Sequence, residues 1–121
     1  MTSHSNGGLR LLAALALAAS LPLAHPADPR TPTGQQLAHD VYKGNCLACH
    51  QIPGDSTAVS RANIGPPLVH MRSRFPDRTT LRNQIWDSTA RNLETVMPPF
   101  GKHKILTEDE IDLIVEYIYR Y

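Results

Sequence analysis

The feature that most constrains this chain is the stretch Cys46-Leu-Ala-Cys49-His50, which contains both of its cysteines. The two thiols are three positions apart and the imidazole of His50 follows directly, so one turn of backbone can bring all three groups together. No other thiol occurs in the 121 residues. The function of this cluster therefore decides what kind of domain the rest of the chain forms.

Three uses of two closely spaced cysteines fit poorly. A zinc site usually needs a second close pair of ligands, but His39, His70 and His103 are scattered. A thioredoxin-like redox pair follows a strand and precedes a helix, whereas the pattern here predicts a helix before the cluster and a loop after it. A disulfide between the two cysteines would close a small, strained ring and leave His50 unexplained.

The fourth use is covalent haem attachment, for which Cys-x-x-Cys-His is the recognised sequence form. We expect Cys46 and Cys49 to form thioethers with the vinyl groups of one haem c, and His50 to be the proximal iron ligand. The porphyrin would also fill the core. Only 21 of the 94 residues from Asp28 to Tyr121, about 22%, are Leu, Ile, Val or Phe, close to the level at which chains struggle to bury enough apolar surface.

Residues 1–27 are predicted to be a signal peptide. The run from Leu11 to Ala19 is unbroken and apolar, Pro22 follows it, and Arg10 is the only charged side chain before Asp28. The run is far shorter than the roughly 20 residues of a membrane span, so we expect secretion, with cleavage between residues 20 and 27. A buried N-terminal helix is the alternative. Export to the periplasm is predicted, with residues 28–121 as one cytochrome c domain and no membrane segment after cleavage.

Charge is balanced overall but unevenly distributed. From Asp28 onward there are eleven Lys and Arg and eleven Asp and Glu. Arginines crowd the middle of the chain and acids gather in the last segment. With no net basic field to hold phosphates, nucleic acid is not an expected partner. The uneven distribution indicates either a protein partner or the solvated faces of two helices.

Hydrophobic periodicity predicts an all-α domain with three to five short helices and long loops. Helices are expected over 34–45 and 78–88, with a shorter helical turn over 68–75. The final segment begins with a capping box formed by Thr107 and Glu110, followed by an apolar stripe of Ile111, Ile114, Val115 and Ile118. The proline-rich stretches 52–67 and 97–101 are expected to be non-helical. No strand pattern and no internal repeat is found in the sequence.

Two further segments carry candidate site residues. Ile64 to Leu68 contain the Gly-Pro-x-Leu element typical of small class I cytochromes c, and by that resemblance the carbonyl of Pro66 would accept a hydrogen bond from Nδ1 of His50. A simple proline-rich turn is the alternative. The candidates for the sixth iron ligand are Met71, Met97, His39, His70 and His103. Met97 is favoured because two prolines follow it and hold its backbone rigid, and a Met ligand argues for electron transfer.

Four ordered stretches resemble the SoxX family of bacterial sulfur oxidation, the monohaem subunits of SoxAX cytochromes. They are GNCLACHQIPG, NIGPPL, RFPDRTTLRNQIWD and TVMPPFGKHKILTEDEIDLIVEYIY. The resemblance runs from about Gly34 to the C-terminus. It implies a class I cytochrome c fold wrapped around one haem, with residues matching His50 and Met97 as its ligands.

The resemblance also implies a role and partners. SoxX pairs with SoxA in the periplasm as a heterodimer, and the complex is an L-cysteine S-thiosulfotransferase that couples thiosulfate to a carrier-protein cysteine. The sulfur chemistry belongs to the SoxA haem, which has a modified cysteine ligand. The SoxX haem passes electrons to a small cytochrome c. Since this chain has no cysteine beyond Cys46 and Cys49, a relay role without catalytic residues of its own is expected.

Two rival functions remain open. The chain could be a free-standing soluble periplasmic electron carrier with the same haem. It could also be a haem enzyme with a vacant sixth site, which the predicted Met97 ligand speaks against. An obligate partner requires a large apolar patch beside the haem edge, whereas a shuttle needs only a small polar one.

Overall fold

The computed structural model describes residues 1, 2 and 28–121. The predicted signal peptide and its cleavage site lie outside the described residues, apart from Met1 and Thr2. The described chain forms the helices α1 (Gly34–His39), η1 (Cys46–Ala48), α2 (Met71–Arg74), α3 (Arg78–Trp86), η2 (Ser88–Ala90) and α4 (Glu108–Ile118). No strand is found among these residues, which confirms the all-α fold class. None of the helices described is long and apolar enough to cross a membrane.

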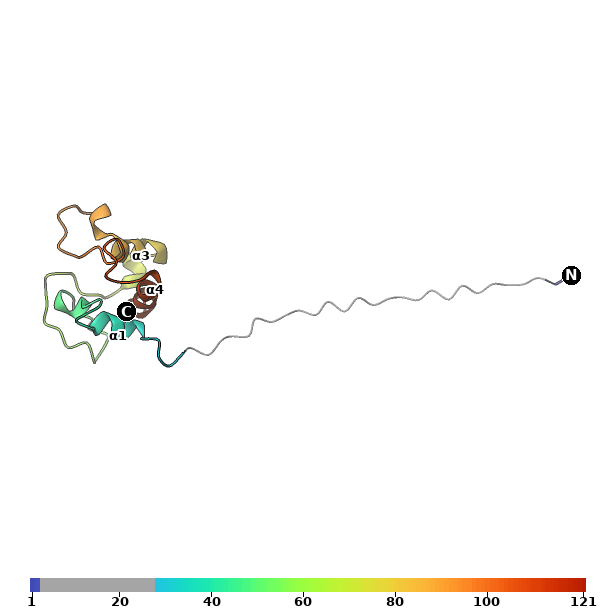
Figure 1. Cartoon of the computed structure of the whole chain (residues 1–121), viewed down its shortest axis with the longest axis horizontal. Helices are drawn as coiled ribbons and strands as arrows, with labels where there is room; N and C mark the ends of the chain where they lie inside the picture. Colours follow the sequence, from blue (N-terminus) through green and yellow to red (C-terminus); the bar gives the residue numbers. More distant parts are fainter. Residues whose placement is uncertain (3–27) are drawn as a thin grey trace.

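Helix α4 is the central support of the domain, because both α1 and α3 pack against it (Figure 1). The crossing with α1 is very close at Gly34. A Cβ added there would lie 1.9 Å from the carbonyl oxygen of Leu113 and 2.9 Å from Cβ of Tyr117. Only glycine permits this approach, so α1 and α4 meet backbone to backbone.

The capping box and apolar stripe predicted for the last helix are both confirmed. The Thr107 hydroxyl accepts a hydrogen bond from the N–H of Glu110 at 3.2 Å, and the Glu110 carboxylate accepts one from the N–H of Thr107 at 2.9 Å. These bonds satisfy backbone donors that a helix start otherwise leaves unpaired. All four residues of the stripe are buried in the core.

The first helix is shorter than the predicted range 34–45, and Asp40 explains the difference. Its carboxylate accepts a hydrogen bond from the N–H of Tyr42 at 2.8 Å, a local turn that competes with helix continuation. The helix therefore ends at His39. In a helix continued to residue 45, Val41 and Tyr42 would share a face with Leu37, but both are exposed.

The middle of the chain follows the prediction with shifted boundaries. Helix α2 begins only after His70, whose φ of 53° lies in the left-handed region. Helix α3 begins after Asp77, whose carboxylate accepts a hydrogen bond from the N–H of Thr79 at 2.9 Å. It ends at Trp86, because the next residue, Asp87, caps the start of η2. The residues from Met97 to Pro99 are non-helical, as their prolines require.

The arginines of α3 and the acids of α4 pair with each other along the line where the two helices pack. Arg82 contacts Asp112 at 2.6 Å and Glu108 at 3.0 Å, and Arg78 contacts Glu116. Exposed pairs of this kind contribute little stability each. Their consequence is that the charges of Arg78, Arg82 and three acids of α4 are paired within the domain.

A buried carboxylate joins α1, the loop after η1 and α4. Asp55 accepts hydrogen bonds from Thr57 Oγ1 at 2.7 Å, from Gln35 Nε2 at 2.8 Å and from the Tyr117 hydroxyl. The bond from Thr57, followed by that from Tyr117, holds the pKa of Asp55 well below its usual range. Burial, followed by the Asp55 carboxylate, raises the pKa of Tyr117 far above its usual range, so the phenol remains a donor.

We expect Asp55→Asn to lower the free energy of unfolding at pH 7 by about 1–3 kcal/mol, because its amide NH2 group would face donors rather than acceptors. The pKa of this carboxyl is lower in the folded state than in the unfolded state, where it is about 4. Its ionised form therefore stabilises the fold fully at pH values above about 4. This contribution is lost as the pH falls from there toward the pKa of the folded state. Denaturant unfolding measured between pH 7 and pH 3 should therefore show that the free energy of unfolding falls more steeply with decreasing pH in the wild type than in Asp55→Asn.

Asp28→Asn is the matched control, because Asp28 contacts the exposed Arg30 at the surface. Its unfolding free energy at pH 7 should equal that of the wild type. Equal acid sensitivity of Asp55→Asn and the wild type would contradict the role given to Asp55.

Candidate functional site

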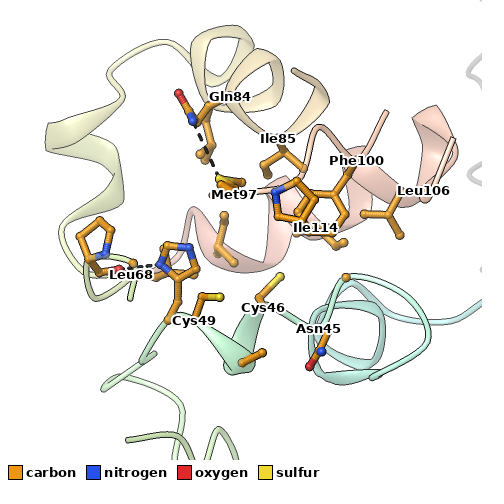
Figure 2. Close-up of a pocket in the computed structure, with 18 of the residues that line it drawn as sticks. Asn45, Cys46, Cys49, Leu68, Gln84, Ile85, Met97, Phe100, Leu106 and Ile114 are labelled. Carbon is orange, nitrogen blue, oxygen red and sulfur yellow. Dashed lines mark hydrogen bonds between the residues drawn. The ribbon is translucent and has the colours of Figure 1, made fainter. Parts of the chain in front are cut away.

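A cavity of about 560 Å³ opens in the middle of the domain. This volume lies within the range of small-molecule and cofactor sites. Its walls are mainly apolar. They come from α3 (Leu81, Ile85), from α4 (Ile114, Ile118) and from loop residues (Leu68, Phe100, Leu106). Cys46 and Cys49 lie on one side of the cavity and Met97 with Gln84 on the opposite side (Figure 2).

Turn η1 presents the two cysteines to the cavity. Asn45, just before it, adopts a left-handed conformation with φ 46°, which Asn tolerates better than most residues. The sulfurs of Cys46 and Cys49 both point toward the cavity (Figure 2), and the two thiols are not joined to each other. Burial raises the pKa of the Cys46 thiol to about 11. Such a thiol stays protonated at neutral pH, which is the opposite of a reactive redox cysteine.

The imidazole of His50 is held from behind by the segment 64–68. Nδ1 of His50 lies 2.7 Å from the carbonyl oxygen of Pro66, the contact expected from the sequence. A Cβ added at Gly65 would lie 2.2 Å from Cε1 of the ring. The absence of a side chain at this position therefore leaves room for the imidazole. Because a carbonyl oxygen only accepts, Nδ1 carries the proton and Nε2 keeps a free lone pair.

Met97 lies in the loop between η2 and α4 and is anchored to the helices beside it. The buried hydroxyl of Ser88 donates to the carbonyl oxygen of Met97 at 2.6 Å. Gln84 Nε2 lies 3.8 Å from the Met97 sulfur, shown by a dashed line in Figure 2. Farther along this loop, Gly101 packs beneath Trp86, since a Cβ there would lie 2.1 Å from the indole.

The structure separates the five candidates for a sixth ligand into two groups. Met71 and Met97 line the cavity, whereas the three histidines do not. His39 contacts the Tyr117 hydroxyl at 3.1 Å. His70 and His103 are exposed.

The donor set and the cavity together fit a haem c. An apolar space of suitable volume is lined by two thiols three positions apart, an imidazole with a free Nε2 lone pair and a thioether. Zinc fits less well, because no group of three or more His, Cys, Asp and Glu side chains is placed to hold a metal in the part of the chain that the structure describes. The set therefore suits a flat apolar group with a central metal.

Sequence reasoning missed the two residues that anchor Met97. Gln84 and Ser88 are polar residues in a helical segment and have no distinguishing pattern in the sequence. Their partner lies nine to thirteen positions away, across a loop whose path no local rule predicts. The prolines after Met97 signalled a rigid loop, but gave no sign of what it is fixed to.

Comparison with known proteins agrees with this site. The model of the family described as cytochrome c oxidase, cbb3-type, subunit III matches residues 34–118, which include every cavity residue named above. An uncharacterized lipoprotein of Aquifex aeolicus (strain VF5) is 35% identical over 77 residues, covering 64% of this chain and 36% of that protein. The chain thus spans about a third of the length of this relative. Membership of a cytochrome c family implies covalently bound haem c, and the chain belongs to the family of cbb3-type subunit III cytochromes as a c-type electron-carrier domain.

Proposed function

We propose that this domain binds one haem c, which Cys46 and Cys49 would hold through thioethers and whose iron His50 and Met97 would ligate. The observation that carries the proposal is the convergence of these four side chains on one apolar cavity. When bound, the haem supplies a one-electron ferric–ferrous couple. Pro66 and Gly65 orient His50, while the apolar walls exclude water from the buried face of the group.

Met97 is preferred to Met71 as the second ligand because of its surroundings. Met71 is only 1% exposed and belongs to the core cluster, and its sulfur lies 3.5 Å from Arg74 Nη1. Arg74 is itself held by the carbonyl oxygen of Pro67 at 2.8 Å. Met97 lies instead on the wall opposite the cysteines (Figure 2), where a group attached to the cysteines would reach it.

We expect Met97→Ala to abolish the weak ferric absorption band near the red edge of the visible spectrum that reports sulfur ligation. Its reduction potential should also fall, because a thioether ligand favours ferrous iron. Met71→Leu, which conserves volume, is the matched control and should keep the band. A band that survives Met97→Ala, or disappears in Met71→Leu, would contradict the assignment.

Covalent attachment is tested by mass. The exported wild-type protein should exceed its polypeptide mass by one haem and retain its colour after denaturation. Replacing both cysteines with serine should remove the covalent haem and, because ligand binding stabilises the folded state, greatly reduce helical circular dichroism. Native-like helicity in the double variant would show that the haem is not needed to complete the core.

We further propose that the domain is the electron-relay subunit of a SoxAX complex, taking electrons released by thiosulfate conjugation and passing them to a small cytochrome. Four exposed apolar residues form the apolar rim of the cavity: Val41, Ile64, Val96 and Ile105, with exposed fractions of 65%, 64%, 75% and 39%. With the haem bound, this rim would surround its accessible edge. An apolar border of this kind favours a stable protein partner over a transient polar contact.

The charged residues support the same view of the partner surface. The ion pairs between α3 and α4 engage two arginines, Arg78 and Arg82, with three acids of the last helix, so these charges already have partners within the domain. Trp86 and Phe75 pack against the core rather than standing free. The apolar rim is therefore the better candidate for the contact with SoxA.

Expression of the native locus should yield a complex in which this cytochrome co-purifies with a second cytochrome. Val96→Asp should weaken that association at least tenfold, because a charge would be buried in the contact without a partner. Val59→Asp is the matched control, since Val59 is 88% exposed but does not line the cavity. Isolation of the chain always as a monomer would instead support the free-standing periplasmic carrier.

A further inference from the structure

Gln84 contacts the sulfur of the proposed iron ligand from the side of α3. Its Nε2 lies 3.8 Å from Met97 Sδ, a distance suited to a hydrogen bond to sulfur, whose larger radius lengthens such bonds. A thioether can only accept, so the amide nitrogen is the end of the Gln84 side chain that faces it. Gln84 itself lines the cavity and is half-buried.

A second bond fixes the other end of Met97. Ser88 has no exposed surface, and its hydroxyl donates to the Met97 carbonyl oxygen at 2.6 Å. Gln84 lies in α3 and Ser88 in η2, which follows α3 after the single residue Asp87. The backbone of Met97 and its sulfur are thus both tied to the same stretch, α3 with η2, so this stretch determines where the thioether lies.

We propose that Gln84 is a positioning residue for Met97 and that its hydrogen bond raises the reduction potential of the bound haem. This inference rests on the proposed assignment of Met97 as an iron ligand. A thioether sulfur has two lone pairs, of which one can bind iron while the other accepts from Gln84. The hydrogen bond draws electron density away from the sulfur, and the positive end of the amide dipole faces the metal site. Both effects favour ferrous over ferric iron, as second-shell contacts to metal ligands generally tune the metal.

The test is a redox titration of the haem-loaded protein. Gln84→Leu should reduce the ferrous-to-ferric ratio at a fixed potential three- to tenfold, the effect expected of one modest hydrogen bond. A tenfold change corresponds to about 59 mV for a one-electron couple. Gln84→Glu, which has nearly the same shape, should lower the potential further, because a carboxylate cannot donate and adds negative charge.

Asn83→Leu is the matched control, because Asn83 is the neighbouring exposed amide on α3. The reduction potential of this variant should equal that of the wild type. If Gln84→Leu fails to load haem, the titration of Gln84→Glu decides. A potential of either Gln84 variant equal to or above that of the wild type would overturn the inference.

The ferric sulfur band separates this inference from the proposal on which it rests. If the wild type lacks the band, or Met97→Ala keeps it, Met97 is not the ligand and the proposed function fails at that residue. If the band behaves as expected but the Gln84 variants titrate like the wild type, Met97 remains the ligand and only the role of Gln84 is lost. A band that weakens in Gln84→Leu together with a lowered potential would support the positioning role directly.

Discussion

The hydrogen bond between His50 and Pro66 decides the chemistry of the whole site. A carbonyl oxygen cannot donate, so the 2.7 Å contact fixes the proton on Nδ1 of the imidazole. That leaves the Nε2 lone pair as the free ligand position, beside the thiols of Cys46 and Cys49. The close approach of Gly65 to the ring prevents the imidazole from turning away, so the protein itself sets both the tautomer and the orientation of His50.

Consecutive prolines shape both walls that face the haem position. Pro66 and Pro67 follow Gly65 on the His50 side, and Pro98 and Pro99 follow Met97 on the other. Proline fixes its own φ and restricts the residue before it to extended conformations, so each pair stiffens a loop that has no helix to support it. Rigid loops lower the entropy that is lost when a ligand is held in place. The structure adds a tether to each loop, from Gly65 N–H to the Cys49 carbonyl oxygen at 2.8 Å and from Ser88 to Met97 at 2.6 Å.

The sequence predicted features that depend on spacing along the chain and missed those that depend on contacts across it. The Cys46-x-x-Cys49-His50 cluster, the Thr107 capping box and the proline loops are local patterns, and the fold class follows from them. The early end of α1 was missed because a single side chain, Asp40, outcompetes a helical hydrophobic pattern by bonding its own backbone neighbour. The bond between Tyr117 and Asp55 joins residues 62 positions apart, and only the folded topology brings them together.

Helix α4 explains how one short element serves the cavity and both packing partners at once. Residues four apart lie on the same face of a helix, and three such rows of α4 meet three different neighbours. Ile114 and Ile118 line the cavity, while Leu113 and Tyr117 meet Gly34 of α1. The third row consists of the acids that pair with α3: Glu108, Asp112 and Glu116.

Because the three rows belong to one rigid helix, none can move without the others. A rotation of α4 against Gly34 would also shift the cavity wall and the ion pairs to α3. Since α3 carries Gln84 and leads into Ser88, such a shift would reach Met97 as well. The position of the proposed thioether ligand therefore depends on the packing of α1 against α4 on the other side of the domain, although no residue of α1 lines the cavity.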